Sequence, residues 1–234
     1  EEYITMGMAA YGKPTLAEHM KKFLLKRNNH KGIGYYCDYA KDYDLAASVQ
    51  KVYEDELNRI VKKYCKKINL VLSGGCALNC VANSNIKRNI WIMPNPGDSG
   101  SSLGCIPAVT KQRLNWKGPF LGYNIRGEYP VDSIIKELET NKMVGVANGR
   151  AEFGPRALGN RSLLADPRGP EVKDMVNEIK KRQKFRPFAP AILLEDVHDY
   201  FDMPQPTSPY MQFVGKCKYP KEFPAIIHAD GTSR

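Results

Sequence analysis

Three arginines stand among glycines and a proline in residues 149–162, which read GRAEFGPRALGNRS. Arginine binds phosphate or carboxylate through a planar fork of N–H donors, and glycine lets the backbone approach a ligand closely. A second basic run, KKRQKFRPFAP at residues 180–190, interleaves its charges with aromatic residues and prolines. That composition favours an ordered pocket over a mobile tail. The two runs together predict a rigid anion site, which we expect to take a phosphorylated small molecule.

Arginine clamps on a transferring phosphate or carbamoyl phosphate would stabilise charge that develops during a reaction. The basic candidates in the two runs are Arg150, Arg156, Arg161, Lys180 and Arg186. The alternative is a structural network of these cations with the acids Glu152, Glu171 and Glu178. A third segment, HADGTSR at residues 228–234, brings a histidine, an aspartate and an arginine together, which is unusual for a loop.

A glycine turn follows a predicted buried strand at residues 68–72. The turn is Ser73-Gly74-Gly75, and residues 77–86 could form the next helix. A strand, a glycine turn and a helix form a common nucleotide contact, because the helix N-terminus offers free N–H groups. Asn79 could offer its amide to a ribose or base on this helix, or it could be a satisfied surface residue.

Asp98 lies between glycines just past a second predicted strand, at residues 90–93. Ligands of α/β sheets bind at strand ends, and a carboxylate there can hold a divalent metal or orient a hydroxyl nucleophile. The alternative is an Asx-turn or a cap for the small-residue helix predicted over residues 101–110. The sequence leaves both interpretations open.

Hydrophobic periodicity and helix caps predict the remaining elements. The helices are predicted over residues 15–27, over residues 45–66 with Asp44 as cap, from a cap at Asp132, from Pro170 to about residue 181, and over residues 195–201. The strands are predicted over residues 143–147 and 191–194. Residues 111–130 contain glycines and prolines and have mixed polarity, so we interpret them as a linker. We therefore predict two domains, residues 1–117 and 118–234.

The chain has 234 residues, of which 42% are hydrophobic, so it can fill a core. The net charge of +10 permits nucleic-acid binding, but the excess is local, and we expect anionic small molecules instead. The 6 cysteines lack CxxC spacing and the 4 histidines are scattered, which excludes a zinc pattern. No apolar run reaches the roughly 18–20 residues of a membrane span, and no signal peptide opens the chain, so we expect a cytoplasmic protein with reduced thiols.

These residues taken together resemble the O-carbamoyltransferase family of nodulation and antibiotic-tailoring enzymes. The matching stretches, in the family's order, are residues 6–14, 73–79, 97–100, 149–168, 181–190 and 228–234. The resemblance implies an α/β protein: the C-terminal lobe of an actin/Hsp70-type ATPase-like domain, then an incomplete YrdC-like domain. The implied reaction forms carbamoyl-adenylate from ATP and carbamoyl phosphate with release of pyrophosphate. The carbamoyl group then passes to a hydroxyl of a small-molecule acceptor.

The resemblance also implies a role for individual residues. Asp98 would be a ligand of a divalent metal, iron or magnesium, at the transfer site. The nucleotide contacts of that site would be Gly74, Gly75 and Asn79. The groups that bind carbamoyl phosphate and the phosphates of ATP would be Arg156, Lys180, Arg186 and Arg234, and their supports would be Arg150 and Arg161.

By the same resemblance, a metal-binding histidine pair lies upstream of Glu1, and neither His19 nor His30 matches it. We therefore expect a piece of a longer protein, inactive or badly impaired alone, whose exposed apolar surface could self-associate. Two other functions stay open. An actin-like small-molecule kinase or ATPase would share the glycine turn and Asp98 but would not use the arginine runs. A basic nucleic-acid-binding module would show an affinity that falls steeply with salt.

Overall fold

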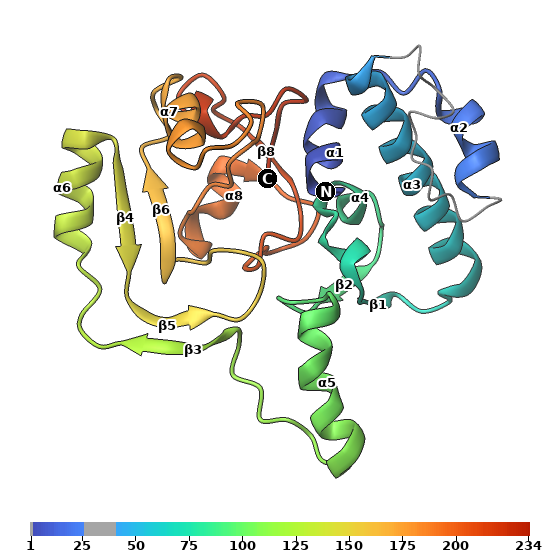
Figure 1. Cartoon of the computed structure of the whole chain (residues 1–234), viewed down its shortest axis with the longest axis horizontal. Helices are drawn as coiled ribbons and strands as arrows, with labels where there is room; N and C mark the ends of the chain where they lie inside the picture. The colour runs from blue at the N-terminus through green and yellow to red at the C-terminus, as the bar shows by residue number, and fades with distance from the viewer. Residues whose placement is uncertain (1, 26–40) are drawn as a thin grey trace.

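The computed structural model describes residues 2–25 and 41–234, and every structural statement below concerns those residues. The architecture is mixed α/β, with helices around four small sheets in the described chain (Figure 1). The helices are α1 Glu2–Met8, α2 Ala17–Leu24, α3 Asp42–Tyr64, α4 Cys80–Ser84, α5 Asp98–Thr110, α6 Val131–Asn141, α7 Val172–Ile179 and α8 Val197–Tyr200. The 3-10 turns are η1 Ala9–Tyr11, η3 Gly75–Leu78, η4 Leu194–Asp196 and η5 Pro224–Ile226.

The strands make one parallel pair and three antiparallel sheets. Their bounds are β1 Asn69–Leu72, β2 Asn89–Ile92, β3 Phe120–Ile125, β4 Met143–Ala147, β5 Gly149–Glu152, β6 Arg161–Ala165, β7 Phe201–Asp202, β8 Gly215–Cys217 and β9 Thr232–Ser233. β1 pairs with β2 in parallel, β3 with β5 and β4 with β6 antiparallel, and β7, β8 and β9 form the last sheet in that order.

The first predicted helices are confirmed as α2 and α3, which pack through buried Met20 and Val52. Residues 26 and 27, at the end of the first prediction, lie outside the described residues. The predicted cap of the second helix is wrong. α3 begins at Asp42, and the carboxylate of Asp44 instead accepts the Lys13 N–H at 2.8 Å, so it ties the loop after η1 to the helix.

β1 and β2 confirm the two strands predicted around the glycine turn and Asp98. The helix predicted over residues 77–86 is broken at Asn79 into η3 and α4. The break has a local cause, because the Asn79 side chain accepts the Ala82 N–H at 3.0 Å and so starts a new helix instead of continuing one. The helix predicted from residue 101 begins three residues earlier, at Asp98.

The predicted linker is wrong in part, because residues 111–130 contain β3. This strand pairs with β5, with Phe120 opposite Glu152 and Asn124 opposite Arg150. The pairing joins segments far apart in the sequence, so local composition gave no signal of it. The boundary between residues 117 and 118 stays a prediction.

α6 and α7 cover the β4–β6 sheet, and β4 matches its predicted strand (Figure 1). α7 buries Val172 and Val176 against the β6 side. Two predicted helix starts are wrong. Asp132 lies inside the first turn of α6 without capping it, because the helix begins at Val131, and Pro170 precedes α7 instead of sitting in its first turn.

The strand predicted over residues 191–194 is absent. Leu193 and Leu194 are each 64% exposed, and η4 begins at Leu194. In the described part of the chain this segment has no strand beside it, and an unpaired extended segment cannot make the hydrogen-bond ladder that defines a strand. The helix predicted next, over residues 195–201, is confirmed in shortened form as α8.

The C-terminal half of the chain completes the core of the β1–β2 pair. Phe213 packs against Ala77 and Ile92, all three buried. The side-chain amide of Gln212 donates to the Ile92 oxygen at 2.6 Å, and the amide of Asn83 donates to the Gln212 oxygen at 3.2 Å. The N- and C-termini lie close together in Figure 1. The first and last segments of the chain are therefore neighbours in the fold.

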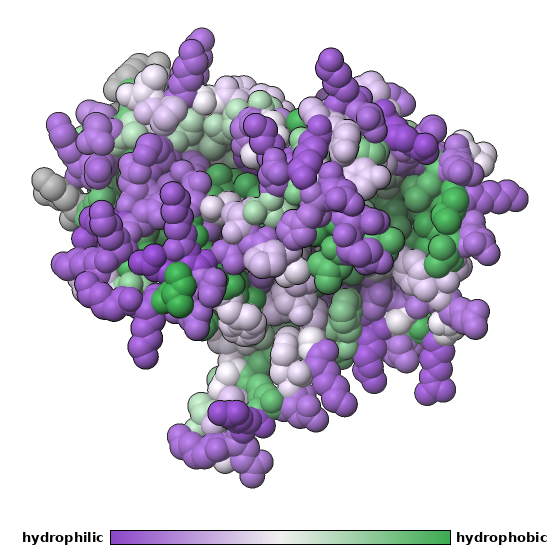
Figure 2. Space-filling model, turned by 180° about the vertical axis from the view of Figure 1, so that it is seen from behind, coloured by the Kyte–Doolittle hydropathy of each residue, from purple (hydrophilic) through white to green (hydrophobic). Residues whose placement is uncertain are grey.

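α5 projects away from the rest of the molecule (Figure 1). Only Gly100 is buried along it, and a Cβ there would collide with the Asn95 oxygen, so glycine lets the helix start against the loop after β2. Apolar side chains such as Ile106 and Val109 are exposed, and Figure 2 shows hydrophobic surface on this projection. No helix in the described part of the chain is long and apolar enough to cross a membrane.

Candidate functional site

The glycine turn and Asp98 lie together at the carboxyl end of the β1–β2 pair. The Gly74 N–H donates to the Pro96 oxygen at 2.7 Å, which joins the loops that follow the two strands. A Cβ on Gly97 would lie 4.0 Å from the Gly75 Cα. Since parallel strands end at the same edge of a sheet, the structure brings these predicted residues to one edge.

This edge is open. A Cβ on Gly74 or Gly75 would meet nothing within 4 Å, and the side chain of Asp98 is exposed with no hydrogen bond or ion pair in the described residues. Asp98 is the first residue of α5 and makes no cap, so the cap interpretation is wrong. Its carboxylate is free to meet a ligand at a helix N-terminus.

Asn79 lies nearby but is already engaged. Besides capping α4, its amide exchanges two hydrogen bonds with buried Gln50, at 2.9 and 3.1 Å. The side chain therefore joins α3 to the start of α4. Its predicted contact with a nucleotide stays a prediction, and the side chain already makes three internal hydrogen bonds.

Arg150 and Arg161 bind backbone oxygens. The Arg161 guanidinium donates to Asn148 at 2.8 Å, to Asn160 at 2.7 Å and to Tyr123 at 3.0 Å. Arg150 donates more weakly to Gly122 at 3.3 Å. Arg150 thus joins β5 to β3, and Arg161, the first residue of β6, joins its strand to β3 and to the start of β5. Their role as supports of phosphate-binding groups stays a prediction.

Arg156 is held differently. Its Nε is buried and has no hydrogen-bond partner in the described chain. Burial raises the pKa of the Cys80 thiol, and the positive charges of Arg234 and Arg156 oppose that shift, so both arginines lie near the start of α4. The loop that carries Arg156 touches the loop before Asp98, since a Cβ on Gly154 would lie 3.1 Å from the Pro94 oxygen.

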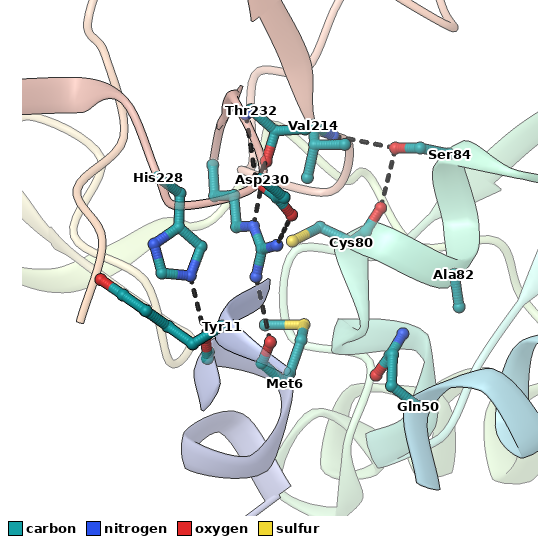
Figure 3. A network of polar contacts seen from close by, with 12 residues as sticks. Met6, Tyr11, Gln50, Cys80, Ala82, Ser84, Val214, His228, Asp230 and Thr232 are labelled. Carbon is teal, nitrogen blue, oxygen red and sulfur yellow. Dashed lines mark hydrogen bonds and ion pairs between the residues drawn. The ribbon is translucent and has the colours of Figure 1, made fainter. Parts of the chain in front are cut away.

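Arg234 and His228 bind the first helix (Figure 3). The Arg234 guanidinium donates to the Met6 oxygen at 3.1 Å and to Thr232 Oγ1 at 3.2 Å, and it forms an ion pair with Asp230. The side chain is 5% exposed. The sequence marked this segment as an unusual cluster, and the structure shows it as a contact between the C-terminal residues and α1.

Lys180, Arg182 and Arg186 form a group of cations after α7. Burial, then the charges of Arg182 and Arg186, lower the pKa of Lys180. Burial and Arg186 lower the pKa of Arg182 to about 10. No carboxylate contributes to either shift. Like charges held close together favour the binding of an anion.

The group is rigid on one side. The guanidinium of Arg186 stacks over the Tyr3 ring at 4.8 Å, and that of Arg182 stacks over Phe188 at 4.5 Å. Arg182 Nε also donates to Asn177 at 2.6 Å. Sequence reasoning did not select Arg182, although it stands between the two predicted cations. The alternative of an arginine network with Glu152 does not hold for this residue, because its carboxylate binds backbone N–H groups.

Two family models match the sequence of this chain. Residues 18–106 match the carbamoyltransferase N-terminus, and residues 135–234 match the carbamoyltransferase C-terminus. The chain belongs to the carbamoyltransferase family. The two matches cover the strand-end loops with Asp98, both arginine runs and the C-terminal segment with Arg234.

The carbamoyltransferase relatives include nodulation proteins. The chain is 39% identical to nodulation protein U of Sinorhizobium fredii over 71% of the chain and 33% of that protein. It is 32% identical to nodulation protein NolO of Bradyrhizobium diazoefficiens over 100% of the chain and 53% of that protein. An uncharacterized protein of Synechocystis is 34% identical over 83% of the chain and 42% of its own length. The chain thus spans about half or less of these relatives.

Proposed function

We propose that this carbamoyltransferase is part of an ATP-dependent O-carbamoyltransferase. Water first cleaves carbamoyl phosphate to carbamate and inorganic phosphate, and a carbamate oxygen then bonds to the α-phosphorus of ATP as pyrophosphate leaves, which gives carbamoyl-adenylate. The oxygen of an acceptor hydroxyl then bonds to the carbamoyl carbon as AMP leaves, and the hydroxyl proton passes to a base. In this proposal the first half of the chain is the lobe of an ATPase-like transfer domain, and the second half opens a YrdC-like domain that makes the adenylate.

One observation carries the proposal: the cations Lys180, Arg182 and Arg186 lie together, two of them stacked on aromatic rings, and none of them forms an ion pair with an acid in the described residues. An anion with several negative oxygens would relieve their mutual repulsion and stay aligned by their N–H donors. Arg156 adds a buried Nε that lacks a partner in the described chain, which suits a donor reserved for a ligand. Donors fixed in advance stabilise charge that develops on a phosphate as it leaves.

The transfer step would take place at the strand-end edge. Asp98 is exposed there and could orient the acceptor hydroxyl. The loop that carries Arg156 touches the loop before Asp98, which supports a short path between the two reactions.

The implied divalent ion fits these residues poorly. No three His, Cys, Asp or Glu side chains in the described chain are grouped to hold a metal. Asp98 offers one carboxylate, and the other ligands would have to come from elsewhere in the protein. No step is therefore derived through the metal.

The test compares the intact protein with its Arg186→Ala variant. Pyrophosphate release from ATP is followed with and without carbamoyl phosphate. We expect release that depends on carbamoyl phosphate and falls by about 100-fold in the variant, because one fixed donor contributes about that much. Arg126→Ala is the control, since Arg126 is an exposed arginine of the β3–α6 loop.

Release without dependence on carbamoyl phosphate would contradict the proposal and favour an ATPase or small-molecule kinase with an actin-like lobe. A nucleic-acid-binding module predicts a different pattern: binding that weakens steeply with salt and hardly changes in Arg156→Ala.

A further inference from the structure

The loop between β5 and β6 is closed by a carboxylate of the protein itself. Glu152, the last residue of β5, accepts three backbone N–H groups on one oxygen: those of Leu158 at 2.8 Å, Asn160 at 2.9 Å and Arg161 at 3.3 Å. Converging backbone N–H groups form a nest that binds anions. In this loop the carboxylate of Glu152 occupies the nest.

The bound carboxylate stays ionised. Burial alone would raise the pKa of Glu152, but hydrogen bonds from the N–H groups of Leu158, Asn160 and Arg161, and its own, together lower it. Glu152 forms no ion pair with an arginine side chain in the described chain, so the charge acts on the backbone.

Arg156 lies in the segment that this contact closes. The bond from the Leu158 N–H to Glu152 encloses residues 153–157, and Arg156 keeps a buried Nε with no described partner. A long cation with an unmet donor does not hold one direction by itself. Its direction depends on the loop backbone.

The two ends of the loop are fixed by other contacts. The Asn160 amide donates to the Arg150 oxygen at 2.8 Å, and the Gly159 N–H donates to Ser162 Oγ at 2.9 Å. Gly154 rests against the loop after β2. Among the described residues, Glu152 is the β5 side chain that binds the N–H groups of the segment just after Arg156.

We propose that Glu152 is the positioning residue for Arg156: its carboxylate fills the N–H nest of the β5–β6 loop and thereby holds the guanidinium where substrate phosphate binds. The nest itself is kept from binding that phosphate, which goes to side chains instead. This inference rests on the proposed function, because Arg156 is taken as a phosphate-binding group.

The first experiment uses chemical rescue in the intact protein. Glu152→Ala removes a group the size of acetate and opens the nest. We expect carbamoyl-phosphate-dependent pyrophosphate release to fall by about 100-fold, as misplacing a catalytic group does. Added acetate, at tens of millimolar, should raise pyrophosphate release by Glu152→Ala at least about tenfold. Glu152→Gln keeps an acceptor oxygen and should lose much less.

Acetate should not change the wild type or the control Glu195→Ala, because Glu195 is an exposed acid of η4. It should also raise the Tm of Glu152→Ala in a saturable manner and leave the wild-type Tm unchanged. Failure of acetate in both readouts would overturn the nest assignment.

The second experiment is a double-mutant cycle with Arg156→Ala. It measures both pyrophosphate release and the affinity for carbamoyl phosphate by calorimetry. If Glu152 acts through Arg156, the double variant loses no more than Arg156→Ala alone. Additive losses would overturn the inference.

The binding readout separates the two proposals. If the wild type binds carbamoyl phosphate but releases no pyrophosphate, the proposed function fails, while non-additive binding losses would still support Glu152 as a positioning residue. If the wild type neither binds nor reacts, both proposals fail.

Discussion

The Nε2 atom of His228 lies 2.9 Å from the main-chain oxygen of Gly7, which stands 221 positions earlier in the chain. A carbonyl oxygen can only accept, so Nε2 carries the proton. Nδ1 is buried and has no partner in the described residues. The neutral ring therefore joins the C-terminal segment to α1, beside the contact of Arg234 with Met6.

The protonation of His228 should make stability depend on pH. Burial, then the charge of Arg234, lowers the pKa of His228 to about 4. The unfolded chain binds this proton near pH 6.5, so the free energy of unfolding should fall by about 3 kcal/mol as pH drops from 6.5 to 4. Urea unfolding at several pH values measures this. His228→Gln can still donate to Gly7 but does not titrate, and its stability should vary less with pH.

The matched control is His198→Gln, an exposed histidine of α8. It should keep the pH dependence of the wild type. An equal pH dependence in wild type and His228→Gln would contradict the assignment.

Arg234 should stabilise the fold through the three contacts of its guanidinium and not only through its charge. It satisfies Asp230, Thr232 and Met6 at once from a nearly buried position. Lysine cannot span three partners, so we expect Arg234→Lys to lower the free energy of unfolding by about 2 kcal/mol, measured by urea unfolding. Arg113→Ala, at an exposed arginine, is the control. A fully stable Arg234→Lys would contradict this contribution of the three contacts to stability.

Asn79 should contribute to stability through its helix cap. Asn79→Ala loses the bond to the Ala82 N–H and both bonds to Gln50, which keeps its bond to Glu54, so we expect a loss of about 1–2 kcal/mol. Asn79→Asp keeps an acceptor for the cap and should lose less. Thermal unfolding and ATP affinity are measured together. A weaker affinity for ATP at unchanged stability would show instead that Asn79 binds the nucleotide.

The cation group after α7 should limit stability in the absence of an anion. Replacing Lys180 removes repulsion with Arg182 and Arg186, so Lys180→Gln should raise the free energy of unfolding by about 0.5 kcal/mol at low salt, a small value because the side chain is exposed to screening. Added phosphate should raise the wild-type Tm more than that of the variant. Equal shifts would argue against phosphate binding at this group. Lys117→Gln, at another exposed lysine, is the control.

The sequence correctly predicted those elements that depend on residues close to one another in the chain. The periodicity of α3, the apolar segment of β4 and the glycine turn after β1 were all found from residues close in sequence. β3 was missed because its partner β5 lies beyond α6 and β4. Residues 191–194 were predicted as a strand because they are apolar, but no strand edge in the described chain meets them.

The same division holds for the site. The sequence by itself identified the two arginine runs and the glycine turn with Asp98, because each depends on chemistry within a short stretch, and its motifs carried the resemblance to the carbamoyltransferase family. Tertiary structure decided what each cation does. The guanidinium groups of Arg161 and Arg234 donate to backbone oxygens and to an aspartate. Lys180, Arg182 and Arg186 lie together with no ion pair to an acid in the described residues. A hydrogen bond depends on distances of about 3 Å between atoms that folding brings together, and the order of residues does not contain those distances.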